Sequence, residues 1–239
     1  MGETGKEDGC DRRLTVSQPI RNGLKNWGMA TGVMMGLMIA FGMRCNVGVA
    51  VVKVMSDSSG DPAFAWTPDQ ITNVDQSFFW GHILTMLLGG FLTTFFLKPN
   101  LVFGVAILVT SLFNLLLPVA STLHPNAVIG VRCLQGLADG ATIPSSFAIL
   151  SLWAPSSVRT FIATFAFSGV YFGIFIGVHL SGILAETLYW DTPYYFYGCL
   201  GIIWFLFWFC LSSEQPGINI DTHQSAKPTL RTTPWLKVG

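Results

Sequence analysis

Charged side chains are scarce in this sequence of 239 residues, of which only 11% are Asp, Glu, Lys or Arg. A water-soluble domain has about 25% charged residues, so this chain lacks the polar side chains that would cover a water-exposed surface. The 13 basic and 13 acidic residues give a net charge of zero. This balance argues against nucleic-acid binding, which depends on a basic surface. The scarcity of charge therefore indicates a lipid environment.

Cysteine and histidine are also few, with five and four residues respectively. The sequence has no CxxC pair and no cluster of His with Cys, so it predicts neither a metal site nor a disulfide framework. It also has no nucleophile motif or nucleotide-binding motif. We therefore expect no enzymatic activity and no cofactor.

Hydrophobic side chains are abundant, at 51% of the sequence, and they include 19 Phe and 8 Trp. A membrane-spanning helix needs about 20 apolar residues, and six apolar segments alternate with polar connections. They are residues 27–54, 69–97, 101–120, 127–151, 160–184 and 194–211. The sequence therefore predicts an all-α membrane protein with six transmembrane helices, forming one bundle over residues 27–211.

The distribution of Lys and Arg predicts the orientation, because basic residues gather in cytosolic loops. With six helices, most of the basic residues fall on one side of the membrane. These are Lys6, Arg12, Arg13, Arg21, Lys25, Lys98, Arg159, Lys227, Arg231 and Lys237. We therefore expect both termini in the cytosol, with residues 1–26 as a disordered tail and residues 212–239 as a second cytosolic segment.

Segment 127–151 carries two charges, Arg132 and Asp139, inside an apolar run. Seven residues are close to two helical turns, so both charges lie on one face but about 10 Å apart along the axis. That separation favours partners on other helices. A charge at membrane depth is costly and by default marks a functional face. The alternative is a structural contact between the two side chains.

A second arginine, Arg44, lies in the first apolar segment. A guanidinium group is always charged and can hold a carboxylate or phosphate through two hydrogen bonds. Two intramembrane arginines without an obvious surplus of acids indicate a polar cavity that attracts a small anionic solute. Arg44 and Arg132 are thus the candidate substrate-binding residues. The alternative is that each arginine is paired with an acid and serves assembly only.

Three titratable residues are candidates for proton coupling, namely Asp139, Asp75 and His82. Asp139 is the best candidate because it shares a face with Arg132. Asp75 lies near a predicted helix end, where it can simply be solvated. His82 can be an interior histidine with satisfied hydrogen bonds, although histidine is the side chain that titrates nearest neutrality.

Glycines at four-residue spacing form stripes of small residues on three of the predicted helices. Such stripes let neighbouring helices approach closely, and we interpret them as helix-packing seams. In a transporter that rocks, the same seams are where helices slide. The residues are Gly28, Gly32 and Gly36, then Gly136 and Gly140, then Gly169, Gly173 and Gly177.

Several segments together resemble one family. FGMRCNVGVAVV (41–52), SFFWGHILTMLLGG (77–90), VRCLQGLADGATIPS (131–145), WAP (153–155), ATFAFSGVYFG (163–173) and YFYGCLGIIWFLFW (195–208) follow that family's order and spacing. The family is the vesicular glutamate transporter, sialin and sodium–phosphate cotransporter group of the major facilitator superfamily. The resemblance covers residues 27–216.

The resemblance implies secondary active transport of organic or inorganic anions by alternating access, coupled to protons or sodium. It implies a location in a vesicle, lysosomal or plasma membrane. The family uses the arginines at the positions of Arg44 and Arg132 in anion handling. Asp139 stands where the family usually has a Glu implicated in proton coupling. Asp75 stands where vesicular glutamate transporters have a histidine, so glutamate, sialic acid, nucleotide, urate and phosphate all stay open as substrates.

Transporters of this family have twelve helices in two halves, with the substrate site between the halves. This sequence resembles the N-terminal half, and its last eight residues, TTPWLKVG, resemble the segment before helix seven. We therefore expect the second half to be absent. The alternative to a transporter is a truncated, transport-incompetent half or an assembly subunit.

Overall fold

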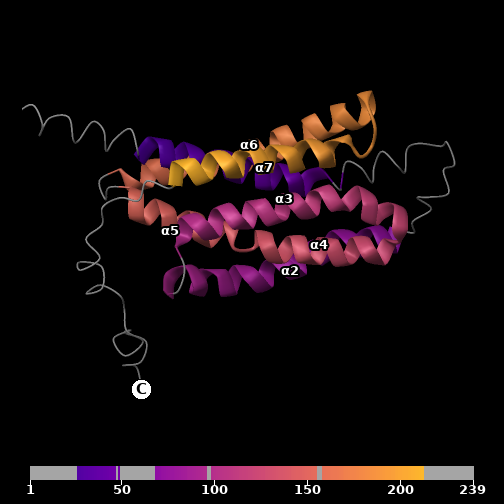
Figure 1. Ribbon diagram of the computed structural model, residues 1–239, viewed down its shortest axis with the longest axis horizontal. Helices are drawn as coiled ribbons and strands as arrows, with labels where there is room; N and C mark the ends of the chain where they lie inside the picture. The colour runs from indigo at the N-terminus through magenta and orange to yellow at the C-terminus, as the bar shows by residue number, and fades with distance from the viewer. Residues whose placement is uncertain (1–25, 47, 49–67, 96–97, 155–157, 213–239) are drawn as a thin grey trace, which may run out of the picture.

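The computed structural model describes residues 26–46, 48, 68–95, 98–154 and 158–212, and it shows helices and no strand among them. Figure 1 shows the helices lying side by side along one long axis, with an N-terminal helix, in indigo, ahead of α2. The helices are Asn26–Asn46, α2 (Pro68–Phe95), α3 (Pro99–Leu123), α4 (Pro125–Asp139), α5 (Thr142–Trp153), α6 (Arg159–Thr187) and α7 (Thr192–Ser212). The predicted all-α class is confirmed.

Four of the described helices are long and apolar enough to cross a membrane. They are the N-terminal helix, α3, α6 and α7. The other predicted spans correspond to α2, which carries Asp75 and His82, and to α4 and α5 taken together. The predicted tails, residues 1–26 and 212–239, lie almost entirely outside the described residues, as does the end of the first predicted helix after residue 48.

The fourth predicted helix, 127–151, is not continuous, which corrects the sequence-based expectation. The chain turns at Gly140 and Ala141, and two helices, α4 and α5, lie on either side of this break. The physical cause is Pro144 in the first turn of α5. Proline has no backbone N–H and its ring collides with the carbonyl group four residues earlier, which here belongs to Gly140. The break follows Asp139 directly.

Tryptophans of α7 fill the core between the N-terminal helix and α3. The indole rings of Trp204 and Trp208 stack with centroids 5.3 Å apart, and both meet the ring of Phe103 edge-on. Gly32 and Gly36 face these indoles, and there is no room for a side chain at either glycine. Trp208 also donates a hydrogen bond of 2.9 Å to the Asn100 carbonyl group. α7 is thereby fixed against the start of α3.

Two further seams bring helix backbones into contact. On α6, Gly169, Gly173 and Gly177 lie against Met34, Met38 and Gly42 of the N-terminal helix.

On α4, Gly136 and Gly140 lie against the backbone of α2 at Phe78 and His82. A side chain at either glycine would push the two helices apart. This close approach of α2 to α4 positions His82 beside Asp139.

Candidate anion site

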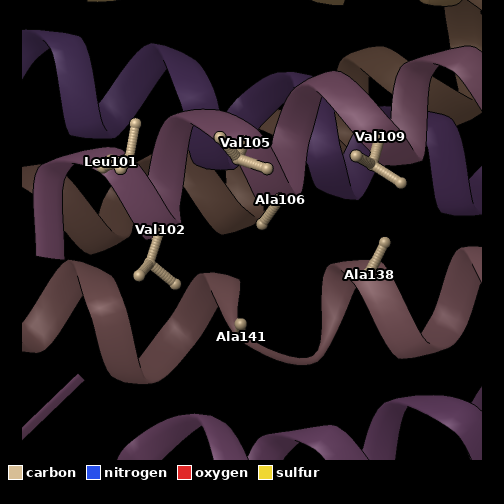
Figure 2. Close-up of a pocket in the computed structure, with 7 residues that line it drawn as sticks. All are labelled: Leu101, Val102, Val105, Ala106, Val109, Ala138 and Ala141. Atoms are coloured by element: carbon tan, nitrogen blue, oxygen red, sulfur yellow. The ribbon is translucent and has the colours of Figure 1, made fainter. Parts of the chain in front are cut away.

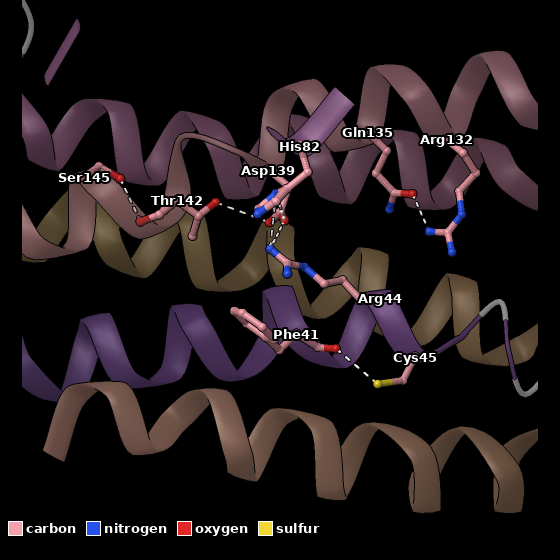
Figure 3. A network of polar contacts seen from close by, with 9 residues as sticks. All are labelled: Phe41, Arg44, Cys45, His82, Arg132, Gln135, Asp139, Thr142 and Ser145. Atoms are coloured by element: carbon pink, nitrogen blue, oxygen red, sulfur yellow. Dashed lines mark hydrogen bonds and ion pairs between the residues drawn. The ribbon is translucent and has the colours of Figure 1, made fainter. Parts of the chain in front are cut away.

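Asp139 is the centre of a polar cluster inside the bundle. Its carboxylate is fully buried and forms an ion pair with Arg44 of the N-terminal helix. The Thr142 hydroxyl, from the first turn of α5, donates to the other carboxylate oxygen at 3.3 Å. With His82 of α2, which also contacts this carboxylate, side chains of three other helices meet Asp139 of α4, as Figure 3 shows. We call Arg44, His82, Asp139 and Thr142 the Asp139 cluster.

His82 lies at the junction between the two charged groups of this cluster. Its Nδ1 is 3.3 Å from the Asp139 oxygen that Arg44 contacts, and 3.5 Å from Arg44 Nη2. A neutral Nδ1 can accept from the guanidinium, whereas a protonated Nδ1 donates to the carboxylate. The imidazole also stacks on the ring of Phe78 at 5.8 Å between centroids. In this position, neutral His82 can hydrogen-bond to Arg44, and protonated His82 can hydrogen-bond to Asp139.

Arg132 begins a second buried network, directed toward α3. Its Nη1 donates to Gln135 Oε1 at 2.9 Å, and Gln135 Nε2 lies 3.5 Å from Asn114 Oδ1. Asn114 in turn donates to the Tyr194 carbonyl group at 2.8 Å. Arg132 is only 1% exposed, and its Nε has no hydrogen-bond partner. We call Arg132, Gln135 and Asn114 the Arg132 network.

The ring of Phe78 joins the two groups of residues. The guanidinium carbons of Arg44 and Arg132 each lie 5.3 Å from its centroid. Arg44 also lies 4.0 Å from the ring of Phe41, one turn earlier on its own helix. Aromatic faces stabilise cations without neutralising them. The two arginines therefore share an aromatic surface.

The charges of this centre are not balanced by ion pairs. Asp139 pairs with Arg44, whereas no carboxylate in the described part of the chain forms an ion pair with Arg132. Asp75 acts on Arg132 only through the longer-range field, and its own side chain is exposed. A buried cation without a counter-ion is expensive in a low-dielectric interior. The arrangement thus favours binding of an additional negative charge.

The structure brings together most of the residues singled out from the sequence. Arg44, His82 and Asp139 are in direct contact, and Arg132 joins them through Phe78. Asp75 has an exposed side chain on α2 and acts on Arg132 only at longer range. Arg132 and Asp139 make no contact with each other, and each has its own partners.

Sequence reasoning missed the neutral members of the site, which are Phe41, Phe78, Asn114, Gln135 and Thr142. Only their spacing from the charged residues gave a signal. Gln135 follows Arg132 by three residues on α4, so these two side chains share one helical face. Thr142 follows Asp139 by three residues across the break between α4 and α5. Asn114 had no such signal, because it lies on a different helix.

The helices and the buried arginine–aspartate centre define a membrane protein that crosses the bilayer several times. The family model described as Major Facilitator Superfamily matches residues 27–238. The chain belongs to this superfamily.

Three curated relatives are similar to the chain over most of its length. It is 41% identical to vesicular glutamate transporter 1 of Bos taurus over 194 residues, covering 77% of the chain and 34% of the relative. It is 41% identical to vesicular glutamate transporter 2 of Homo sapiens over 191 residues, covering 76% and 33%. Vesicular glutamate transporter 3 of Danio rerio is 38% identical over 208 residues, covering 83% and 35%.

These matches confirm the resemblance stated from the sequence. The chain spans about a third of the length of the curated relatives it matches.

Proposed function

We propose that the protein transports a small organic or inorganic anion across a membrane by alternating access. The observation that carries the proposal is the buried centre in which Arg44 and Arg132 share the ring of Phe78 while only one of them has an acidic partner. Superfamily membership and the similarity to vesicular glutamate transporters support it.

In this proposal the two arginines have different roles. The Arg44 side chain is 19% exposed, so it is the group that an entering anion meets. Arg132 is almost completely buried and adds a positive field that water does not screen. Interactions between charges are several times stronger in such an interior than in bulk water. Arg44 thus binds the anion, and Arg132 raises the affinity.

Asp139 serves in this scheme as an internal competitor of the substrate. Its carboxylate forms an ion pair with the guanidinium of Arg44. A substrate carboxylate would form the same kind of ion pair with Arg44. A proton on Asp139 removes that competition and releases Arg44 to the anion. By thermodynamic linkage, the bound anion then favours the protonated Asp139. This reciprocity is the basis of proton–anion symport.

His82 gives the cluster a second proton site. When protonated, its Nδ1 donates to Asp139 and repels Arg44, so the guanidinium is again freed. The groups facing His82 are Arg44 from the N-terminal helix and Asp139 from α4. Arg132 lies behind the Phe78 ring, and Cys45 follows Arg44 on its helix. The adjoining α5 carries no ionisable side chain.

We also propose the orientation of the protein in the membrane and the kind of membrane that contains it. The excess of Lys and Arg at the predicted cytosolic side supports cytosolic termini in a multi-pass protein. The names of the relatives point to a vesicle membrane, and a lysosomal or plasma membrane fits the same site. Proton and sodium are the two coupling ions to be distinguished.

The test is uptake into liposomes containing the purified protein at its natural length. Radiolabelled glutamate, sialic acid, urate, nucleotide and phosphate are offered separately. For each, the proton gradient, the sodium gradient and the membrane potential are varied one at a time. We expect uptake of at least one anion, with stimulation by an inward proton gradient.

Three variants make the assay specific for the site. Arg44→Ala and Arg132→Ala should each abolish uptake. Arg159→Ala is the matched control, because Arg159 lies at the exposed start of α6, where it donates a hydrogen bond to the Ala154 carbonyl group. Unchanged uptake in Arg44→Ala would contradict the proposed site. Absence of uptake for every anion offered would contradict the proposed function.

A further inference from the structure

A groove outside the Asp139 cluster lies where α3 passes the break between α4 and α5. It has a volume of about 330 Å³ and is lined only by hydrocarbon side chains. The lining includes Leu101, Val102, Val105 and Val109 of α3, with Ala138 and Ala141 on the two sides of the break. Figure 2 shows the two alanines facing α3 across the groove. Its volume is within the range of ligand-binding pockets.

The direction of the groove matches that of a lipid chain. α3 is a membrane span, so its first turn lies near the membrane surface. From Leu101 to Val109 the groove follows the helix inward by about 12 Å, which is most of one leaflet's hydrocarbon thickness of about 15 Å. The groove therefore runs from the headgroup level toward mid-membrane along the path that an acyl chain takes.

A basic residue, Lys98, directly precedes α3 at the outer end of the groove. Lys98 is exposed, and its backbone carbonyl group accepts the hydrogen bonds of Leu101 and Val102, the first two residues of the groove. In the proposed orientation this end faces the cytosol, where the membrane surface carries anionic lipids. Lys98 thus adds an attraction for a negative headgroup to a groove that fits a hydrocarbon chain.

We infer that this groove binds one acyl chain of an anionic phospholipid, with the headgroup beside Lys98. The inference uses the orientation given with the proposed function but does not require anion transport. The inner end of the bound chain would lie against Ala138 and Ala141, which enclose Asp139 and Gly140. A lipid there would contact the break from its α3 side, whereas Gly140 faces α2. The bound lipid would thereby hold Asp139 in place.

The experiment uses the protein at its natural length in nanodiscs. The nanodiscs contain either phosphatidylserine or phosphatidylcholine, and each of these lipids carries a photoreactive diazirine on its acyl chain. Mass spectrometry then maps the labelled residues. We expect the serine lipid to label residues 98–109 and 138–141 more than the choline lipid does. A diazirine near the ester should label around Leu101, and one near mid-chain should label around Ala138.

Two pairs of variants test the groove and its charge. Val105→Phe fills the groove and should reduce its labelling to background, whereas Val119→Phe, at an exposed position on the same helix, should not. Lys98→Gln should abolish the preference for the serine lipid, and Lys98→Arg should keep it. Labelling of the exposed aromatic residues of α6 must stay unchanged in each variant, which verifies folding.

Three results would overturn the inference. The first is equal labelling of the groove and of the exposed α6 surface, which would indicate ordinary boundary lipid. The second is groove labelling that Val105→Phe leaves unchanged. The third is equal labelling by the serine and choline lipids in the unmodified protein.

Discussion

Arg44 and Asp139 form an ion pair across 95 positions of sequence, and the carboxylate of Asp139 is fully buried. Its stabilising partners are Arg44, His82 and the Thr142 hydroxyl. The pair therefore joins the N-terminal helix to the end of α4. In the proposed function the same contact must open to admit an anion, so its strength affects both stability and transport.

The first prediction concerns the energy of this pair. Removing one member of a buried ion pair leaves an uncompensated charge, which costs about 3–5 kcal/mol. Arg44→Gln and Asp139→Asn should each destabilise the protein, and the double variant should be more stable than the sum of the two effects predicts. Thermal unfolding of the four purified proteins in one detergent measures the difference. Strict additivity would show that the pair contributes no coupling energy.

The second prediction concerns proton coupling. Asp139→Asn keeps the size of the side chain but removes both the charge and the exchangeable proton. We expect this variant to keep anion binding and to lose the stimulation of uptake by an inward proton gradient. Asp139→Glu is the matched control and should remain stimulated, because it retains the carboxylate. The measurement is initial uptake into liposomes at several external pH values with the membrane potential clamped.

If an inward proton gradient still stimulates uptake by Asp139→Asn, then Asp139 is not the residue that carries the coupling proton. His82→Asn would then be informative, because an amide can hydrogen-bond like imidazole but does not titrate near neutral pH. Loss of stimulation in that variant alone would assign the coupling to His82.

The sequence was sufficient to predict most helices of the fold and to select charged residues that lie together in the structure. Apolar runs of membrane-spanning length predict helices whatever packs around them, so α3, α6 and α7 lie close to their predicted positions. Intramembrane charges are rare enough to be noticed singly, which is why Arg44, Arg132 and Asp139 could be selected.

The break after Asp139 and the partners of each charge could not be predicted in the same way. Pro144 is a local signal for the break, but a proline inside a membrane helix is often tolerated. The sharing of Phe78 by two arginines depends on how α2 packs against the N-terminal helix and α4. The spacing of Gly136 and Gly140 indicates a packing seam on α4, but it does not identify α2 as the helix that packs there.

The third prediction tests the seam between α2 and α4. A Cβ atom at Gly136 would collide with backbone atoms of Phe78 and His82, which cannot move without separating the helices. Gly136→Ala should therefore destabilise the protein by about 1–3 kcal/mol and weaken the proton dependence of uptake by displacing His82.

Gly130→Ala is the control for this seam, because Gly130 lies on the same helix and has open space at its Cβ position. It should leave stability unchanged or raise it by up to about 1 kcal/mol, since alanine favours helix. If the two substitutions had equal effects on thermal unfolding, the close contact between α4 and α2 at Gly136 would be refuted.

The fourth prediction concerns Ser181, which continues the glycine stripe of α6 and lies against the end of the N-terminal helix. Its hydroxyl donates a hydrogen bond of 2.7 Å to Asn46 Oδ1, and both side chains are fully buried. Asn46 Nδ2 reaches the Pro193 carbonyl group at 3.4 Å, so one asparagine connects three helices. Ser181→Ala leaves the Asn46 oxygen buried without a donor, which should cost about 1–3 kcal/mol.

Ser151→Ala provides the comparison, because Ser151 is exposed and its hydroxyl donates to the Ala148 carbonyl group of its own helix. That substitution should change the free energy of unfolding by less than about 0.5 kcal/mol. A double variant, Asn46→Leu with Ser181→Ala, removes both side-chain polar groups and should recover part of the lost stability, because the buried Asn46 oxygen is no longer present without a donor. If it is instead less stable than Ser181→Ala alone, the contact of Asn46 with Pro193 outweighs its contact with Ser181.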